Sequence, residues 1–161
     1  MTSYVLYWDQ GADLYTEVVG LSSAFTSNSY IISSGIVAGV TYNFKVAAVN
    51  IWGMGPFSSP VVAILAASAP NTPAPPSTSI DPTTGGVAIS WIQPNTNGAP
   101  ITSYTVEIMT STSAWHTEVT DCNSATVVSQ RRCVMPMASL YGATYSLTQG
   151  MPVYARIIAT N

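Results

Sequence analysis

Charge is what this sequence lacks most. Of its 161 residues only 7% are charged, with four Lys or Arg against seven Asp or Glu, whereas ordinary soluble domains carry about 25%. The basic residues form no cluster, which excludes the many phosphate contacts of nucleic-acid binding. Ser and Thr supply the polarity instead. Two explanations stay open: the surface is covered by other protein or by sugar, or it belongs to a secreted protein that is simply neutral.

Long apolar runs and metal ligands are also scarce. The longest apolar run, Pro60–Ala67, has the length of one strand, whereas a membrane-spanning helix needs about 20 residues. His116 is the one histidine, which leaves too few ligands for zinc. The acids Asp9, Asp13 and Glu17 lack the dense spacing of a calcium loop. We therefore expect no metal, no cofactor and no membrane span.

The residues needed for acid–base chemistry are not grouped in the sequence. His116 has neither a nucleophile nor an orienting acid beside it in a pattern typical of catalysis. Glu118 follows two residues later on the same face of an expected strand, and we expect the two side chains to share a surface hydrogen bond. The sequence therefore does not predict an enzyme.

Alternating apolar residues, in contrast, are abundant. Apolar residues make up 47% of the chain, enough for a packed core. In Gly39–Asn50, the side chains of Tyr42, Phe44 and Val46 alternate with smaller or polar ones, which is the period of a half-buried strand. The same strand returns, altered, as Gly150–Asn161. Two copies of one strand in a short chain indicate two related modules.

The stretch from Gly39 to Gly55 resembles strands F and G of a fibronectin type III domain. Tyr42 stands where that family carries its corner tyrosine, whose hydroxyl ties the preceding turn to the sheet. The second copy has Val153 at this position. The resemblance implies a fold and says little about activity, because such sandwiches support many functions.

The remaining strands resemble the same family in their order. Trp91 resembles the core tryptophan of strand B, and Tyr104, in a strand similar to strand C, matches Tyr4. The resemblance implies an all-β fold of two immunoglobulin-like β-sandwiches in tandem, with a structural core at Tyr42, Trp91 and Tyr104. Strands are expected at Ser3–Asp9, Leu14–Val19, Tyr30–Ser33, Phe57–Leu65, Val87–Trp91, Ile101–Ile108 and Trp115–Val119.

We expect the first module over residues 1–67, with strands C to G and without A and B. A linker rich in Pro, Ser and Thr follows over 68–79, and the second module occupies 80–161, with strands A to F and without G. Prolines favour an extended, semi-rigid linker. No complete Asn-x-Ser/Thr sequon occurs, so any sugar would be O-linked. The candidate sites are Thr72, Ser77, Thr78 and Ser79.

Cys122 and Cys133 are the only cysteines, 11 residues apart. We expect a disulfide that closes the hairpin between two strands, which would contribute about 2–3 kcal/mol in the chain-entropy model. The alternative is two free buried thiols in a cytosolic protein. A disulfide implies an oxidising, extracellular or cell-surface location.

The candidate interaction surface consists of aromatic residues. Tyr7 and Trp8 are adjacent in one strand, so one of them points outward, and Trp52 and Trp115 lie beyond the expected core. Outward aromatics can stack on sugar or pack against a neighbouring module. Coverage by the linker or by an adjacent strand is the alternative.

These observations favour a structural role. We expect a non-enzymatic module pair of an extracellular or cell-surface repeat protein, acting as a spacer, a cell-adhesion element or a repeating unit of a filament. Its partners would be neighbouring copies or modules, because strands at open edges leave backbone groups unpaired. The alternative is a module that binds protein or glycan, in a receptor ectodomain or beside a carbohydrate-active enzyme.

Overall fold

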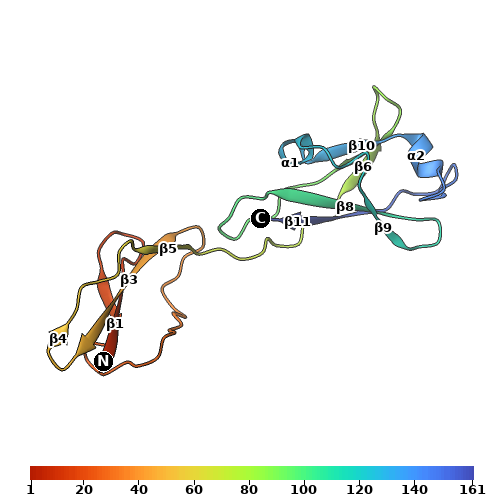
Figure 1. The fold of residues 1–161 in the computed structure, drawn as a ribbon. Coiled ribbons are helices and arrows are strands. Elements are labelled where there is room, and N and C mark those ends of the chain that lie inside the picture. Colours follow the sequence, from red (N-terminus) through yellow and green to blue (C-terminus); the bar gives the residue numbers. More distant parts are fainter. The chain divides into compact units, whose positions relative to one another are not determined.

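The computed structural model describes residues 1–161, which form two compact units: unit 1, Met1–Ser68, and unit 2, Ala69–Asn161. Almost all regular structure is antiparallel β (Figure 1), with eleven strands and two short helices, α1 (Thr126–Gln130) and α2 (Met137–Tyr141). The predicted all-β class is confirmed. Neither helix has the length and apolar character needed to span a bilayer.

Unit 1 is one antiparallel sheet. Its long strands β1 and β3 pair along their length, β2 pairs with the free edge of β1, and the other edge of β3 pairs with β4 and β5 at different ends. The alternating apolar residues of the sequence therefore form this sheet. The strands are β1 (Ser3–Trp8), β2 (Thr16–Val19), β3 (Thr41–Asn50), β4 (Gly53–Met54) and β5 (Val62–Leu65).

Two expected strands of unit 1 differ from the structure. No strand forms at Tyr30–Ser33, because a strand needs a neighbour to satisfy its backbone groups and none lies beside this segment. The strand expected over Phe57–Leu65 is shortened to β5. Pro60, just before it, has no N–H to donate to a ladder.

Unit 2 has two three-stranded sheets that share one buried core. The first has the order β10–β7–β6 and the second β11–β8–β9. The core combines Ile89 and Met135 of the first sheet with Val106 and Ile108 of the second, all at most 1% exposed. This is a β-sandwich. The strands are β6 (Ser77–Ile80), β7 (Val87–Ser90), β8 (Ser103–Met109), β9 (Trp115–Glu118), β10 (Arg132–Met135) and β11 (Ala155–Thr160).

The two units repeat the same strand register. In unit 1 the pairing of β1 with β3 runs from Ser3 opposite Val49 to Trp8 opposite Phe44. Adding 100 to the β1 numbers and 111 to the β3 numbers reproduces all six pairs of β8 with β11. Sheet β2–β1–β3 of unit 1 is thus the counterpart of sheet β9–β8–β11 of unit 2. Unit 1 has no counterpart of the other sheet, β10–β7–β6.

Candidate functional site: an open apolar groove in unit 1

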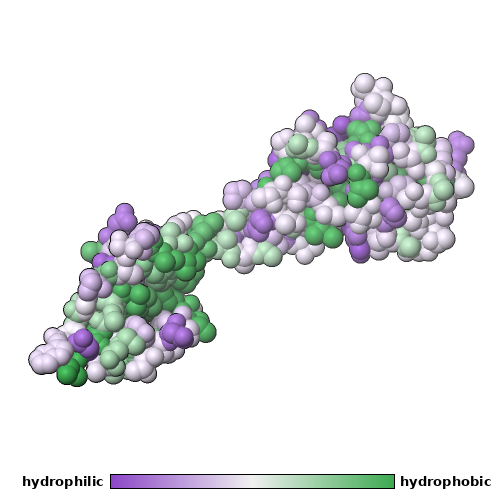
Figure 2. Space-filling view, in the orientation of Figure 1, coloured by the Kyte–Doolittle hydropathy of each residue, from purple (hydrophilic) through white to green (hydrophobic).

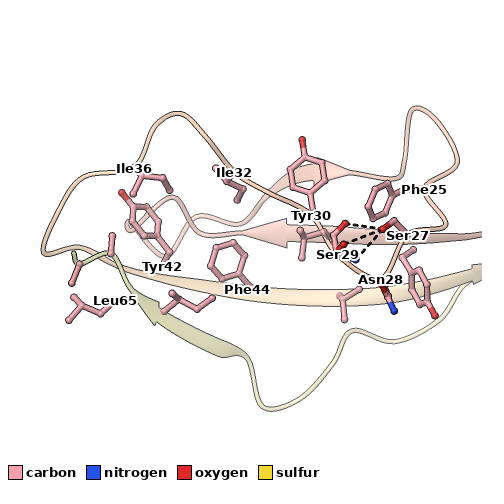
Figure 3. Close-up of a pocket in the computed structure, with 16 residues that line it drawn as sticks. Phe25, Ser27, Asn28, Ser29, Tyr30, Ile32, Ile36, Tyr42, Phe44 and Leu65 are labelled. Carbon is pink, nitrogen blue, oxygen red and sulfur yellow. Dashed lines mark hydrogen bonds between the residues drawn. The ribbon is translucent and has the colours of Figure 1, made fainter. Parts of the chain in front are cut away.

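The groove face of unit 1, the sheet face that carries Tyr4, Leu6, Phe44 and Val46, is hollowed into a cavity of about 770 Å³. The β1 and β3 side chains form its floor, and the irregular segment 25–36 forms one wall. In Figure 3, Tyr42 and Phe44 rise from β3 toward the segment that carries Ile32 and Ile36. No charged residue lines the cavity, so it would bind an uncharged, apolar partner.

The groove face is much more exposed than its counterpart in unit 2. Val46 is 40% exposed, whereas its counterpart Ile157 is 6% exposed. On the neighbouring strand β5, Ile64 also lines the groove and is 54% exposed. Figure 2 shows hydrophobic residues gathered over the unit that carries β3 and β5. An exposed apolar surface of this kind makes the groove a candidate interaction site.

Tyr42 fixes one end of the groove. Its hydroxyl accepts a hydrogen bond from the Val37 N–H (2.8 Å) and donates one to the Gly35 carbonyl (3.3 Å). Its ring stacks on Trp8 at 5.3 Å between centroids. Tyr42, 3% exposed, thus joins the irregular wall to β3.

The opposite face of each unit carries a cation over an aromatic ring. In unit 1, the Lys45 ammonium lies 3.9 Å from the centroid of Tyr15 and also contacts the rings of Tyr7 and Phe57. In unit 2, the guanidinium of Arg156, the counterpart of Lys45, lies 4.5 Å from the centroid of Trp115. Such contacts contribute about 0.5–1 kcal/mol at exposed sites. The similarity between the two units thus includes this side-chain contact as well as the strand register.

The aromatic candidates therefore lie in different surroundings. Tyr7 lies on the opposite face with Lys45, whereas Trp8 lies on the groove face and stacks on Tyr42 and Phe44. Trp115 lies against Arg156. Trp52, at the turn between β3 and β4, is 88% exposed. Within unit 1, Tyr7 and Trp8 therefore lie on opposite faces of the sheet.

The other core candidates lie in unit 2. Trp91 and Tyr104 are buried and pack edge to face at 5.2 Å between ring centroids. The Trp91 indole N–H and the Tyr104 hydroxyl are buried without a hydrogen-bond partner. The rings therefore contribute through packing, and the two polar atoms reduce that contribution.

Buried carboxylates support turns in both units. Asp9, 1% exposed, accepts hydrogen bonds from Asn43 N–H, Asn43 side-chain amide and Gly11 N–H, which lower its pKa. Its oxygens are therefore already bonded. Asp81 pairs with Arg132 and accepts bonds from Thr84, and together these lower its pKa to about 2.

The expected pairing of His116 with Glu118 is wrong. Glu118 is buried and accepts backbone hydrogen bonds from Thr120 (3.0 Å) and Cys122 (2.6 Å). His116 is exposed and packs edge to face against Tyr145. Burial, with added repulsion from nearby Glu118, raises the pKa of Tyr145 to about 12. Glu118 bonds to these backbone N–H groups instead of to His116, because a buried N–H group without an acceptor would be costly.

The disulfide between Cys122 and Cys133 is confirmed, with Cα atoms 5.2 Å apart. It does not close a hairpin as expected. Cys133 lies in β10, which belongs to one sheet, and Cys122 follows β9, which belongs to the other. The bridge therefore links the two sides of the unit 2 sandwich around the short helix α1.

The candidate sugar sites are all on the surface. Thr72 is exposed ahead of β6, whereas Ser77, Thr78 and Ser79 lie within β6, where they are exposed and pair with β7. Three residues of the expected linker therefore belong to a strand. No group of three or more His, Cys, Asp or Glu side chains is arranged to hold a metal ion.

Sequence reasoning missed the groove itself. Its signal was available, because the first module was expected to lack two strands while keeping the alternating face that those strands cover. A comparison with models of known protein families finds no match to this chain.

Proposed function

We propose that the chain is a structural module pair of an extracellular or cell-surface repeat protein, built from fibronectin type III-like sandwiches. The observation that carries this proposal is the repeated register, in which all six residue pairs of β1 with β3 recur between β8 and β11. The Tyr42 hydroxyl bonds match the corner tyrosine of that family. The disulfide supports an oxidising environment.

The proposed role is a repeating unit of a fibre or adhesive filament, without enzymatic activity. The apolar groove of unit 1 and the unpaired edge of β11 both offer places for strands of a neighbour. Contacts that join different surfaces of successive copies do not close and therefore give chains of molecules. The low charge of the chain would favour such contacts.

The test is assembly in solution. We expect sedimentation to show oligomers that lengthen with protein concentration, and electron microscopy to show linear particles. A monodisperse monomer at high concentration, with amide exchange showing both units folded, would remove the fibre proposal.

A second candidate function rests on Trp52. Its ring is 88% exposed beside Ile51, 81% exposed, in a turn of unit 1. Exposed aromatic rings can stack on sugars. In this case, a glycan array should show binding that Trp52→Ala abolishes and Trp115→Ala retains. Absence of binding to every sugar would count against a glycan-binding module.

A further inference from the structure

We propose that the groove of unit 1 binds a β-hairpin of the β6–β7 kind, supplied by a further repeat of this module. The inference rests on the proposed function in one respect, since it takes the partner to be another repeat. It adds the surface, the bound element and the expected pairing.

Unit 2 shows what covers the equivalent face. There Tyr104, Val106 and Ile108 of β8 are at most 8% exposed, beneath a sheet in which β7 contributes Val87 and Ile89 to the same core. Their counterparts in unit 1 are Tyr4, Leu6 and Trp8, which by register occupy the same positions in β1. Tyr4 and Leu6 line the open groove. The groove floor is thus already arranged for a strand like β7.

The wall of the groove offers the backbone pairing. In unit 2, β7 pairs with β10 on one side and β6 on the other. The segment between β2 and β3 holds the place of β10 in the order of unit 1, and it includes Tyr30 and Ile32. Tyr30 is 46% exposed and Ile31 86%. A hairpin in the groove would give this segment the neighbour that it needs to become a strand.

The chemistry of the hairpin fits an uncharged groove. The β6–β7 hairpin, residues 77–91, contains one charged residue, Asp81, which lies at its turn. Within this turn, Asp81 Oδ1 accepts from the Thr83 and Thr84 N–H groups and the Gly86 carbonyl accepts from Asp81 N–H, while Asp81 Oδ2 pairs with Arg132 of β10. The hairpin therefore presents alternate apolar side chains without placing a charge among them.

The hairpin of a second copy's unit 2 is not available for this role. Its Val87 and Ile89 are 5% and 0% exposed, so moving it into another unit 1 would expose one core while covering the other. The donor must therefore be a hairpin of this kind that is not already packed in a core of its own.

The experiment titrates the complete 161-residue chain with a labelled synthetic peptide of residues 77–91. We expect saturable binding of one peptide per chain and slower amide exchange at Tyr30–Ile32. Ile64→Lys places a charge in the groove and should weaken binding about tenfold or more. Ala63→Lys is the matched control, because this exposed neighbour lies on the other face of β5 and should change binding by less than about twofold.

A fused variant covers the case in which the free peptide does not fold. Residues 77–102 are placed directly before Ser3, because Ser103 is the counterpart of Ser3. We expect the fusion to slow amide exchange throughout β1 and β3, and Ile89→Lys in the added copy to abolish the effect.

Several results would overturn the inference. The first is that neither the peptide nor the fusion has any effect. The second is that Ile64→Lys and Ala63→Lys weaken peptide binding equally. The third is that self-association fills the groove and added peptide does not displace it. Assembly into fibres without any response to the hairpin would remove this inference and leave the proposed function standing. Hairpin binding by a chain that stays strictly monomeric would support this inference and remove the fibre proposal.

Discussion

At the residue scale, equivalent-looking aromatics have different roles. Tyr42 makes two hydrogen bonds through its hydroxyl, whereas the hydroxyl of Tyr104 is buried without a partner. The two residues resemble each other in the sequence, since both are tyrosines in alternating strands. Only the surrounding backbone decides which hydroxyl stabilises the fold, because a buried polar group contributes only when it is bonded.

We predict that Tyr42→Phe destabilises unit 1 by about 0.5–1.5 kcal/mol per lost hydrogen bond. Tyr104→Phe should leave unit 2 unchanged or slightly more stable, because it removes a buried hydroxyl that has no partner. Urea titration followed by amide exchange in β3 and β8 reports each unit separately. A loss on Tyr104→Phe as large as that on Tyr42→Phe would contradict this reading.

Asp81 should make unit 2 sensitive to acid. Its pKa is about 2 in the folded state against an ordinary value of 3.8, so the unfolded chain binds more protons between these values. The stabilisation is therefore complete above about pH 4 and is lost as pH falls toward about 2. Asp81→Asn should lower stability at pH 7 and flatten the acid dependence of urea unfolding. Asp13→Asn, in an exposed loop of unit 1, is the control; an unchanged slope in Asp81→Asn would exclude this role.

At the element scale, neighbours decide which segments become strands. Arg132–Met135 forms β10 because β7 pairs with it, although Val134 is its one β-branched residue. Tyr30–Ser33 has one aromatic and two β-branched residues and still stays irregular. Propensity describes how well a residue fits a half-buried sheet, and it cannot supply the missing partner. The position of the disulfide also depends on tertiary neighbours, since it joins β10 of one sheet to the segment after β9 of the other.

Replacing both cysteines with alanine should destabilise unit 2 by about 2–3 kcal/mol, since the link constrains the unfolded chain across 11 residues. Exchange in unit 1 should not change. Reductant added to the variant should have no further effect, whereas reductant added to the parent chain should reproduce the loss. Equal stability of the parent with and without reductant would show that the bridge contributes nothing.

At the scale of the whole molecule, the two units differ in how many apolar residues they bury. Only Val5, Tyr42 and Ala47 are buried apolar residues of unit 1, and the large core cluster lies wholly in unit 2. Burial of apolar surface is the main favourable term in folding, so we expect unit 1 to be less stable than unit 2. This is also why the groove, rather than the aromatic residues, is the stronger candidate for an interaction.

We therefore predict two unfolding steps with increasing urea. Amides of β1 and β3 should exchange in the first step, and those of β7, β8 and β10 in the second. Coincident transitions in both sets of amides would show that the units do not unfold separately.

The sequence by itself determined the all-β class, the repeated strand, the disulfide pairing and the near-absence of charge. These follow from local patterns, namely alternation, internal repetition and the presence of only two cysteines. The tertiary structure decided the absence of a strand at Tyr30–Ser33, the burial of Glu118 and the open groove. Each of these depends on which segments lie beside one another, because backbone groups and apolar faces are satisfied only by neighbours that are present in space.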